Sequence, residues 1–175
     1  MPATPDTLIY RDRVSEAFAR KVCRIAATLG VDADHLMAGM FFETGGTFSP
    51  SVKNPRSSAT GLIQFMNATA LKLGTTTPKL AAMTAVDQLD YVEAYFRPYA
   101  GKLATVEDVY MAILWPRAVG KPSTYVLWKG ADGAAYRVNA GLDLNKDGRV
   151  TKAEAAARVR RIYLDGLYRA GRAGR

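Results

Sequence analysis

A glutamate at the end of an apolar stretch is the first candidate for acid–base chemistry. The sequence FFETGG places Glu43 directly after Phe41 and Phe42 and before paired glycines. Apolar surroundings disfavour a charged carboxylate and raise its pKa, which suits a general acid. The alternative is an exposed glutamate at a helix end without a catalytic role, and the local pattern taken alone favours that alternative.

Two further segments place polar side chains in apolar company. SATGLIQFMNATA, residues 58–70, combines a glycine, apolar residues and a glutamine outside regular helix, which suits close approach to a polar ligand. DVYMAILWP, residues 108–116, places Tyr110 on an otherwise apolar helix. Each has an ordinary alternative: a connection from loop to helix in the first case, and a core tyrosine in the second.

In this order and at these spacings, the three segments resemble the lysozyme-like lytic transglycosylases. The phage-encoded members are the most similar, and goose-type lysozymes share the superfamily. Glu43 and Thr44 stand where the family has Glu-Ser, and residues 61–64 (GLIQ) stand where it has Gly-Leu-Met-Gln. Only Tyr110 is shared with the family's Ala-Tyr-Asn motif. Residues 136–139 (YRVN) also resemble phage relatives, and the resemblance covers roughly residues 10–165.

The resemblance implies that the chain cuts the glycan of bacterial peptidoglycan. Glu43 would protonate the oxygen between N-acetylmuramic acid and N-acetylglucosamine, and would then take the proton of the muramic 6-hydroxyl to leave a 1,6-anhydro product. The substrate-binding residues expected on this basis are Thr44, Gly61, Leu62, Ile63, Gln64, Phe65, Tyr110, Tyr136 and Asn139. Tyr110 and Tyr136 are candidates to orient Glu43 or to line the groove, while Tyr125, Trp115 and Trp128 either stack on sugars or belong to the core.

The distribution of acids bears on the reaction independently of the resemblance. Hydrolytic glycosidases commonly use two carboxylates that flank the bond. Between Thr44 and Met83 the chain has neither Asp nor Glu, so a single acid that uses the substrate's own hydroxyl is favoured over hydrolysis. A lysozyme-type muramidase on the same fold, or an inactive wall-binding or calcium-binding module, remains the alternative.

Residues 143–154, DLNKDGRVTKAE, match the pattern of an EF-hand calcium loop. The alternation of oxygen-bearing side chains turns them towards one point, and Gly148 allows the sharp turn. The ligands expected are Asp143, Asn145, Asp147, the carbonyl of Arg149, Thr151 and Glu154. There is one such loop, and the preceding VNAGL gives no strong entering helix. We therefore expect one structural Ca²⁺ and no cofactor for catalysis; an Asx-rich turn without an ion is the alternative.

Composition and charge limit the class of protein. The chain has 175 residues, 49% hydrophobic and 23% charged, which suits one globular domain over residues 1–175. No apolar run is long enough for a membrane span, and the first residues do not read as a secretory signal. The net charge of +8 favours polyanionic partners, but we see no nucleic-acid-binding motif and expect a monomer that binds no nucleic acid. The expected setting is the host cytoplasm, with holin-mediated release to the periplasmic wall, or else a virion.

The elements that must position these residues are mostly helices. We expect a mainly α, lysozyme-like fold with a small irregular or β-hairpin segment and the EF-hand-like loop. Asp32 or Asp34, Thr84, Thr105 and Thr151 are the expected caps. A second helix is expected to run from Asp32 or Asp34 to the glycines at 45–46. Other helices are expected over residues 10–29, 67–73, 84–97, 105–115 and 151–168. Residues 47–60 are expected to form an extended loop or hairpin, and residues 117–142 an irregular stretch with short strands.

The C-terminal end is strongly basic. Six arginines lie between residues 158 and 175, with Asp165 the single acid after Glu154. A basic helix of this kind can bind anionic outer-membrane lipid. The alternative is a solvated helix face that packs on the domain through Val159, Ile162 and Leu167, followed by a frayed RAGRAGR tail.

Overall fold

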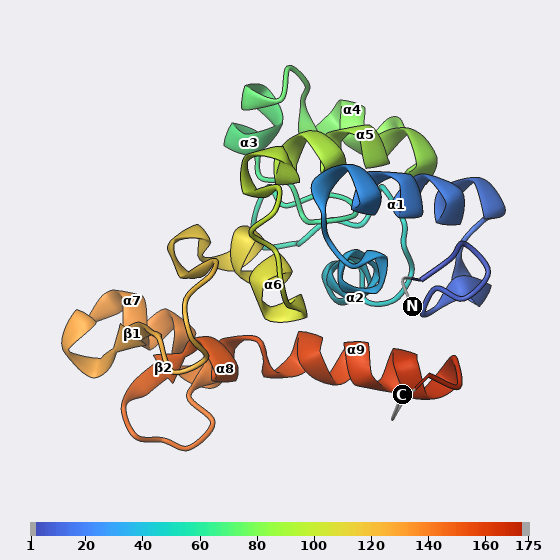
Figure 1. Cartoon of the computed structure of the whole chain (residues 1–175). Helices are drawn as coiled ribbons and strands as arrows, with labels where there is room; N and C mark the ends of the chain where they lie inside the picture. The colour runs from blue at the N-terminus through green and yellow to red at the C-terminus, as the bar shows by residue number, and fades with distance from the viewer. Residues whose placement is uncertain (1–2, 173–175) are drawn as a thin grey trace.

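The structure, a computed structural model, describes residues 3–172 with the exception of the side chain of Asp132. It is mainly helical with one small antiparallel sheet, which confirms the fold class expected from the sequence (Figure 1). Short 3₁₀ turns join several elements. The helices and strands are α1 (Glu16–Leu29), α2 (Ala33–Glu43), α3 (Asn67–Lys72), α4 (Thr77–Ala82), α5 (Ala85–Phe96), α6 (Val106–Leu114), β1 (Val126–Lys129), α7 (Ala134–Asn139), β2 (Arg149–Thr151), α8 (Lys152–Ala155) and α9 (Ala157–Arg169).

Side-chain caps confirm several of the expected helix starts. Asp32 accepts the backbone N–H of Asp34 at 2.9 Å at the start of α2. Thr84 and Thr105 cap α5 and α6 through the N–H groups three residues on. Thr151 forms a full capping box at the start of α8. Each cap satisfies a backbone donor that the first helical turn leaves without a partner.

The structure also departs from the sequence expectations at several elements. The first helix begins at Glu16, because Tyr10 has a left-handed φ of 56° and Ser15 supplies the cap. The last helix divides into α8 and α9 at Ala156. The sequence does not predict α4 or α7, whose six residues each are too few for a helical period to show.

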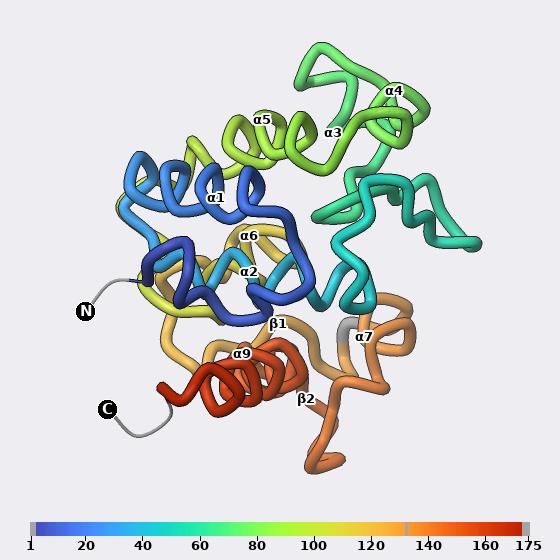
Figure 2. The backbone as a smooth tube through the Cα atoms, turned by 90° about the vertical axis from the view of Figure 1, so that its right-hand side faces the viewer, coloured from blue at the N-terminus to red at the C-terminus, as the bar shows by residue number. Residues whose placement is uncertain are grey.

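The central element is α2, which lies between α1 on one side and α9 on the other (Figures 1 and 2). It also packs against α6, and α1 in turn packs against α5. The eight residues from Ala33 to Met40 are all buried, including the polar Asp34 and His35 near the start of the helix. The buried helix delivers its last residue, Glu43, to the edge of the core.

The small sheet joins β1 and β2, with Trp128 opposite Val150 and Lys129 opposite Arg149. These strands do not form a hairpin, because α7 and most of the predicted calcium loop lie between them. In residues 47–60, where a hairpin was one alternative, the structure has an extended loop with isolated bridges between Lys53 and Thr60 and between Thr60 and Phe65.

The C-terminal end is held more firmly than the expectation of a frayed tail implies. Arg172 donates to the carbonyl oxygen of Thr7 at 3.0 Å and forms an ion pair with the buried Asp34. Residues 173–175 of that expected tail lie outside the described residues. Within the described range, no helix has the length and apolar character needed to cross a membrane.

Candidate functional site

Glu43 is the last residue of α2, and its side chain is only partly exposed. Within residues 3–172 its carboxyl group has no hydrogen-bond or ion-pair partner. Loss of hydration raises its pKa from 4.5 to about 7. The C-terminal end of a helix carries partial negative charge and acts in the same direction. Glu43 can therefore exchange a proton near neutral pH.

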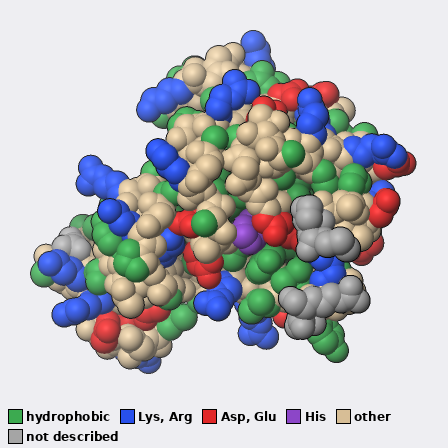
Figure 3. Space-filling model, in the orientation of Figure 1, with side chains coloured by type: hydrophobic (Ala, Val, Ile, Leu, Met, Phe, Trp, Pro, Cys, Tyr) green, Lys and Arg blue, Asp and Glu red, His purple; other side chains and the backbone are tan. Residues whose placement is uncertain are grey.

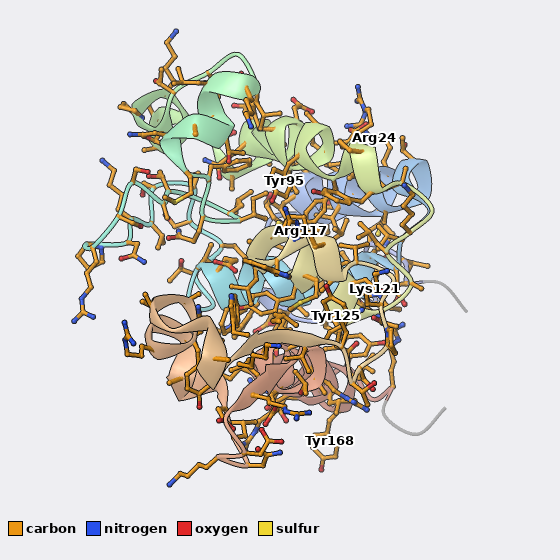
Figure 4. All side chains as sticks on the ribbon, turned by 90° about the vertical axis from the view of Figure 1, so that its left-hand side faces the viewer. Arg24, Tyr95, Arg117, Lys121, Tyr125 and Tyr168 are labelled. Atoms are coloured by element: carbon orange, nitrogen blue, oxygen red, sulfur yellow. The ribbon has the colours of Figure 1, made fainter. Side chains whose placement is uncertain are left out.

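Two tyrosines lie close enough to Glu43 to sense its charge. Burial, a contribution from Tyr99 and the carboxylate of Glu43 together raise the pKa of Tyr95 to about 12. Burial and the carboxylate of Glu43 also raise the pKa of Tyr110, whose ring meets Phe42 edge-on at 5.1 Å. Tyr95 reaches from α5 towards α6 (Figure 4), where its hydroxyl donates to the carbonyl of Ala112 at 2.7 Å.

The two hydroxyls differ in what they are free to do. The hydroxyl of Tyr95 is already bonded to the backbone, whereas that of Tyr110 has no hydrogen-bond partner among the described residues. Tyr110 was expected near Glu43, and the structure places it there. Tyr95 was not predicted, because nothing in the local pattern of α5 relates it to a residue on α2.

Thr44 serves the backbone instead of reaching outward. Its side chain is buried, its hydroxyl donates to the carbonyl of Met40 at 2.7 Å, and the same oxygen accepts the N–H of Phe48 at 3.0 Å. Both capacities of the hydroxyl are thus used within the turn that follows Glu43. Thr44 thus fixes the chain on either side of the acid, and a contact between Thr44 and substrate stays a prediction.

The segment at residues 61–65 is fixed by a glutamine that the sequence did not reveal. The buried Gln88 accepts the N–H of Leu62 at 2.7 Å and donates to the carbonyls of Pro50 and Leu80. Gly61 has a φ of 82°, and a Cβ there would lie 2.3 Å from the Gln88 side-chain oxygen. Only glycine permits this approach.

Within this segment the backbone, and not the side chains, is available to a ligand. Leu62, Ile63 and Phe65 are buried. The amide nitrogen of Gln64 donates to the carbonyls of Val52 and Gly61, at 3.2 and 3.1 Å. In the described part of the chain, the N–H of Ile63 and the carbonyls of Ile63 and Gln64 have no partner. The expectation that backbone groups here bind a sugar therefore stays a prediction that the structure allows.

Ring contacts bring the three predicted segments together. Phe65 meets Tyr95 edge-on at 6.2 Å, and Tyr95 senses the charge of Glu43. Glu43 is in turn next to Phe42, which contacts Tyr110. The segments 41–46, 58–70 and 108–116 thus converge around one acid, although the sequence separates them widely.

The side chains of Tyr136 and Asn139 make local hydrogen bonds. The Tyr136 hydroxyl donates to the Oδ2 atom of Asp143 at 2.6 Å, and the amide of Asn139 donates to the carbonyl of Ala135 at 2.9 Å. Both lie on α7, and no described interaction joins either to Glu43. The Tyr136 hydroxyl is thus bound by the loop at residues 143–154. That Tyr136 and Asn139 bind substrate, and that Tyr136 orients Glu43 or lines the groove, stay predictions. Of the tryptophans, Trp128 is buried and meets the half-buried Trp115 edge-on at 5.2 Å.

The loop at residues 143–154 is ordered by its own oxygens. Asp143 accepts the N–H groups of Asp147 and Gly148, and Asp147 accepts that of Arg149. Hydrogen bonds hold the pKa of Asp143 below its ordinary value, the one from Tyr136 foremost. Burial raises the pKa of Glu154, but its hydrogen bonds to Thr151 and to the backbone of residues 144 and 145 outweigh this and lower it.

The donor chemistry of this loop fits Ca²⁺. Carboxylate, amide and carbonyl oxygens follow the EF-hand order, and Gly148 makes the sharp turn with a φ of 80°. Among the described side chains no three His, Cys, Asp or Glu converge into a metal site by themselves, but an EF-hand loop takes some ligands from amides and backbone. No long helix enters the loop: the six-residue helix α7 ends at Asn139, and a 3₁₀ turn leads from it to Asp143.

A buried ion pair connects this loop to the helix that carries Tyr110. The Nζ atom of Lys152 on α8 lies 2.5 Å from the Oδ1 atom of Asp108 on α6, and it also donates to the carbonyl of Lys121. Burial raises the pKa of Asp108, but hydrogen bonds from Lys152 and Gly120 lower it below its ordinary value. A contact between buried charges thus joins the end of the loop to α6.

Comparisons of the sequence with protein families and with curated proteins find no match.

Proposed function

We propose that the chain is a lytic transglycosylase that cleaves the β-1,4 bond between N-acetylmuramic acid and N-acetylglucosamine in peptidoglycan. The observation that carries the proposal is the environment of Glu43: a carboxyl at the end of a buried helix, without a charged or hydrogen-bonding partner among the described residues, with its pKa at about 7. That combination suits a group that both gives and takes a proton.

The chemistry follows from that proton. Protonated Glu43 gives its proton to the glycosidic oxygen as the bond from C1 of the muramic residue breaks. The substrate's N-acetyl group stabilises the oxocarbenium-like centre. The carboxylate of Glu43 then takes the proton of the muramic 6-hydroxyl, whose oxygen forms a bond to C1, so that a 1,6-anhydro ring results and Glu43 is protonated again.

Tyr110 is the side chain best placed to assist Glu43 in this reaction. Its hydroxyl is close to Glu43 and has no other partner among residues 3–172, so it can donate a hydrogen bond to the carboxylate form or to the sugar. The raised pKa of Tyr110 keeps it a donor at neutral pH. Free backbone groups at Ile63 and Gln64 would hold the glycan alongside.

A muramidase that hydrolyses the same bond is the second candidate. It requires a further carboxylate near the bond. Burial raises the pKa of Glu43, and no other acid contributes to the shift. A neighbouring carboxylate would have added to the shift, so the surroundings of Glu43 favour the one-acid reaction.

We also propose that the loop at residues 143–154 binds one Ca²⁺ as a structural ion. Asp143, Asn145, Asp147, the carbonyl of Arg149, Thr151 and Glu154 would hold it. The ion would neutralise the loop's acids and stabilise the turn that β2 and α8 continue. It would have no part in the bond cleavage.

The biological setting belongs to the same proposal. A phage endolysin would accumulate in the host cytoplasm and reach the periplasmic wall when a holin opens the membrane; a virion-borne enzyme is the alternative. In either setting the chain would act on peptidoglycan as a monomer, without nucleic acid.

Product analysis tests the function. Purified peptidoglycan is digested with the wild type and with Glu43→Gln, and the fragments are analysed by mass spectrometry. We expect anhydromuramic ends with the wild type and no fragments with the variant. Reducing muramic ends from the wild type would replace the transglycosylase with the muramidase, and full activity of Glu43→Gln would remove Glu43 from the mechanism.

A further inference from the structure

The outer face of α9 carries two exposed apolar side chains on a helix whose inner face is well packed. Val159 and Gly166 are buried on the inner face, where α9 meets α2. On the opposite face Leu164 is 50% and Tyr168 78% exposed. Residues four apart lie on the same side of a helix, so the two form one apolar ridge, from which Tyr168 points away from the body of the molecule (Figure 4).

Arginines flank this ridge. Arg158, Arg160, Arg161 and Arg169 are all exposed. Arg160 lies 3.7 Å from Glu107, and Arg161 lies 3.9 Å from Asp165. Both pairs are long and both arginines are exposed, so the pairs contribute little to stability. In the part of the chain that the structure describes, Arg158 and Arg169 have no acidic partner, so most of the positive charge of α9 remains available.

The space-filling view agrees with this arrangement. Along the lower edge, where α9 runs, basic and apolar side chains lie beside one another on the surface (Figure 3). The face therefore combines the two features of helices that lie on membranes: charge for phosphate headgroups, and apolar side chains that enter the headgroup region.

We propose that the outer face of α9 docks on an anionic lipid bilayer. Arg158, Arg161 and Arg169 would contact lipid phosphates, while Leu164 and Tyr168 enter the boundary between headgroups and acyl chains. A hydrated polyanion would satisfy the arginines, but it would offer nothing to the apolar ridge. The ridge is therefore the reason to choose a bilayer.

The helix does not have to detach from the domain to bind in this way. The hydroxyl of Tyr10 donates to the carbonyl of Ile162 at 2.6 Å, and Arg172 holds the far end of α9 against Thr7 and Asp34. The docking face is thus preformed. Arg158, at one end of it, is close enough to Tyr110 for its charge to act on the pKa of that hydroxyl, whereas Arg161, Leu164, Tyr168 and Arg169 have no described interaction with Glu43 or Tyr110. The proposal combines both alternatives for the basic C-terminus: one face of α9 packs on the domain, and the opposite face binds lipid.

Cosedimentation of the full chain with vesicles tests the proposal. Vesicles of phosphatidylglycerol and phosphatidylethanolamine are compared with phosphatidylcholine vesicles. We expect binding only to the anionic vesicles. Arg161→Gln with Arg169→Gln should weaken that binding about 10-fold to 30-fold, since each basic residue near an anionic surface contributes about fivefold. Leu164→Ser with Tyr168→Ser should weaken it by a similar factor.

Matched controls keep the net charge and the number of exposed apolar groups comparable. Arg24→Gln with Arg117→Gln removes two exposed arginines elsewhere (Figure 4), and Leu71→Ser removes an apolar side chain that is 67% exposed on α3. These should bind nearly as the wild type does. Equal weakening by the controls, equal binding to neutral vesicles, or unchanged binding after loss of the ridge would overturn the proposal.

The same variants separate this proposal from the enzymatic one. The α9 variants should digest purified, lipid-free peptidoglycan at the wild-type rate. If no variant and no wild type digests peptidoglycan while vesicle binding follows the α9 substitutions, the enzymatic proposal fails and the docking face stands.

Discussion

The end of α2 and the loop at residues 143–154 both present carboxyl groups, in opposite surroundings. Glu43 has no partner among the described residues, and burial raises its pKa. The side chains of Asp143 and Glu154 each accept several hydrogen bonds, which lower their pKa values. The first carboxyl is poised to change its protonation state near neutral pH, whereas the second pair stays charged.

That difference separates a group suited to chemistry from groups suited to support. A carboxyl group that makes no hydrogen bond within the folded chain can make one to a substrate. Carboxylates that accept hydrogen bonds from their own loop hold its backbone in place, and a bound cation would stabilise the loop further. The two regions meet through the Asp108–Lys152 pair, which connects α8 to the helix of Tyr110.

The largest expected effect breaks the comparison at Glu43. Glu43→Gln keeps the size of the side chain and removes the proton transfer, so activity should fall about 100-fold to 10,000-fold. The rate of release of soluble fragments from peptidoglycan measures it. Glu16→Gln is the control, since Glu16 is an exposed glutamate paired only with Arg20, and it should remain fully active. Comparable losses in the two variants would contradict a special role for Glu43.

Removal of calcium tests the other half of the comparison. If the loop binds Ca²⁺ at about 100 times its Kd, the ion contributes about 2.7 kcal/mol, and chelation should lower Tm by about 5–10 °C. Differential scanning calorimetry before and after chelation, with calcium added back, measures this. Asp143→Asn should lose the response, while Glu43→Gln should keep it. A wild type whose Tm ignores both chelator and calcium would mean that the loop is held by its hydrogen bonds alone.

A smaller effect is expected from the glutamine that fixes residues 61–65. Gln88→Leu leaves the N–H of Leu62 and two carbonyls without partners, which should cost about 2–3 kcal/mol. Tm should fall by several degrees. Activity should also be lower than that of the wild type at temperatures where the variant is still folded. Asp90→Asn on the same helix, where the carboxylate is largely exposed, serves as the control. Activity unchanged in folded Gln88→Leu would separate the segment from the site.

How far the sequence predicts these regions depends on the distance between partners. All the expected Ca²⁺ ligands of the loop lie within twelve consecutive residues. A capping side chain binds a backbone N–H two or three residues further on. Both features can therefore be predicted from local sequence pattern. Gln88 and Leu62 are 26 residues apart, and Asp108 and Lys152 are 44 apart. The environment of Glu43 has the same character, since Tyr95 reaches it from another helix. Tyr136 is the converse case, because Asp143, the partner of its hydroxyl, follows only seven residues later.

The smallest expected effect concerns stability against pH. Folding raises the pKa of Glu43 from 4.5 to about 7, so the folded chain holds this proton more tightly than the unfolded chain does. The associated stability is fully present below pH 4.5 and is lost as pH rises through about 7. Glu43→Gln lacks this loss. Its Tm relative to wild type should therefore rise between pH 4.5 and pH 8, by the equivalent of about 1–3 kcal/mol once partial exposure is allowed for.

The control has the opposite sign. A hydrogen bond and charge from Arg20 lower the pKa of Glu16, so Glu16→Gln should not gain on the wild type as pH rises. Activity should follow the same proton, because Glu43 must start protonated: kcat/KM should decline above about pH 7. If instead the Tm difference between Glu43→Gln and the wild type does not change with pH, water or a bound group already donates hydrogen bonds to the Glu43 carboxylate. Glu43 would then stay charged near neutral pH, as Asp143 and Glu154 do.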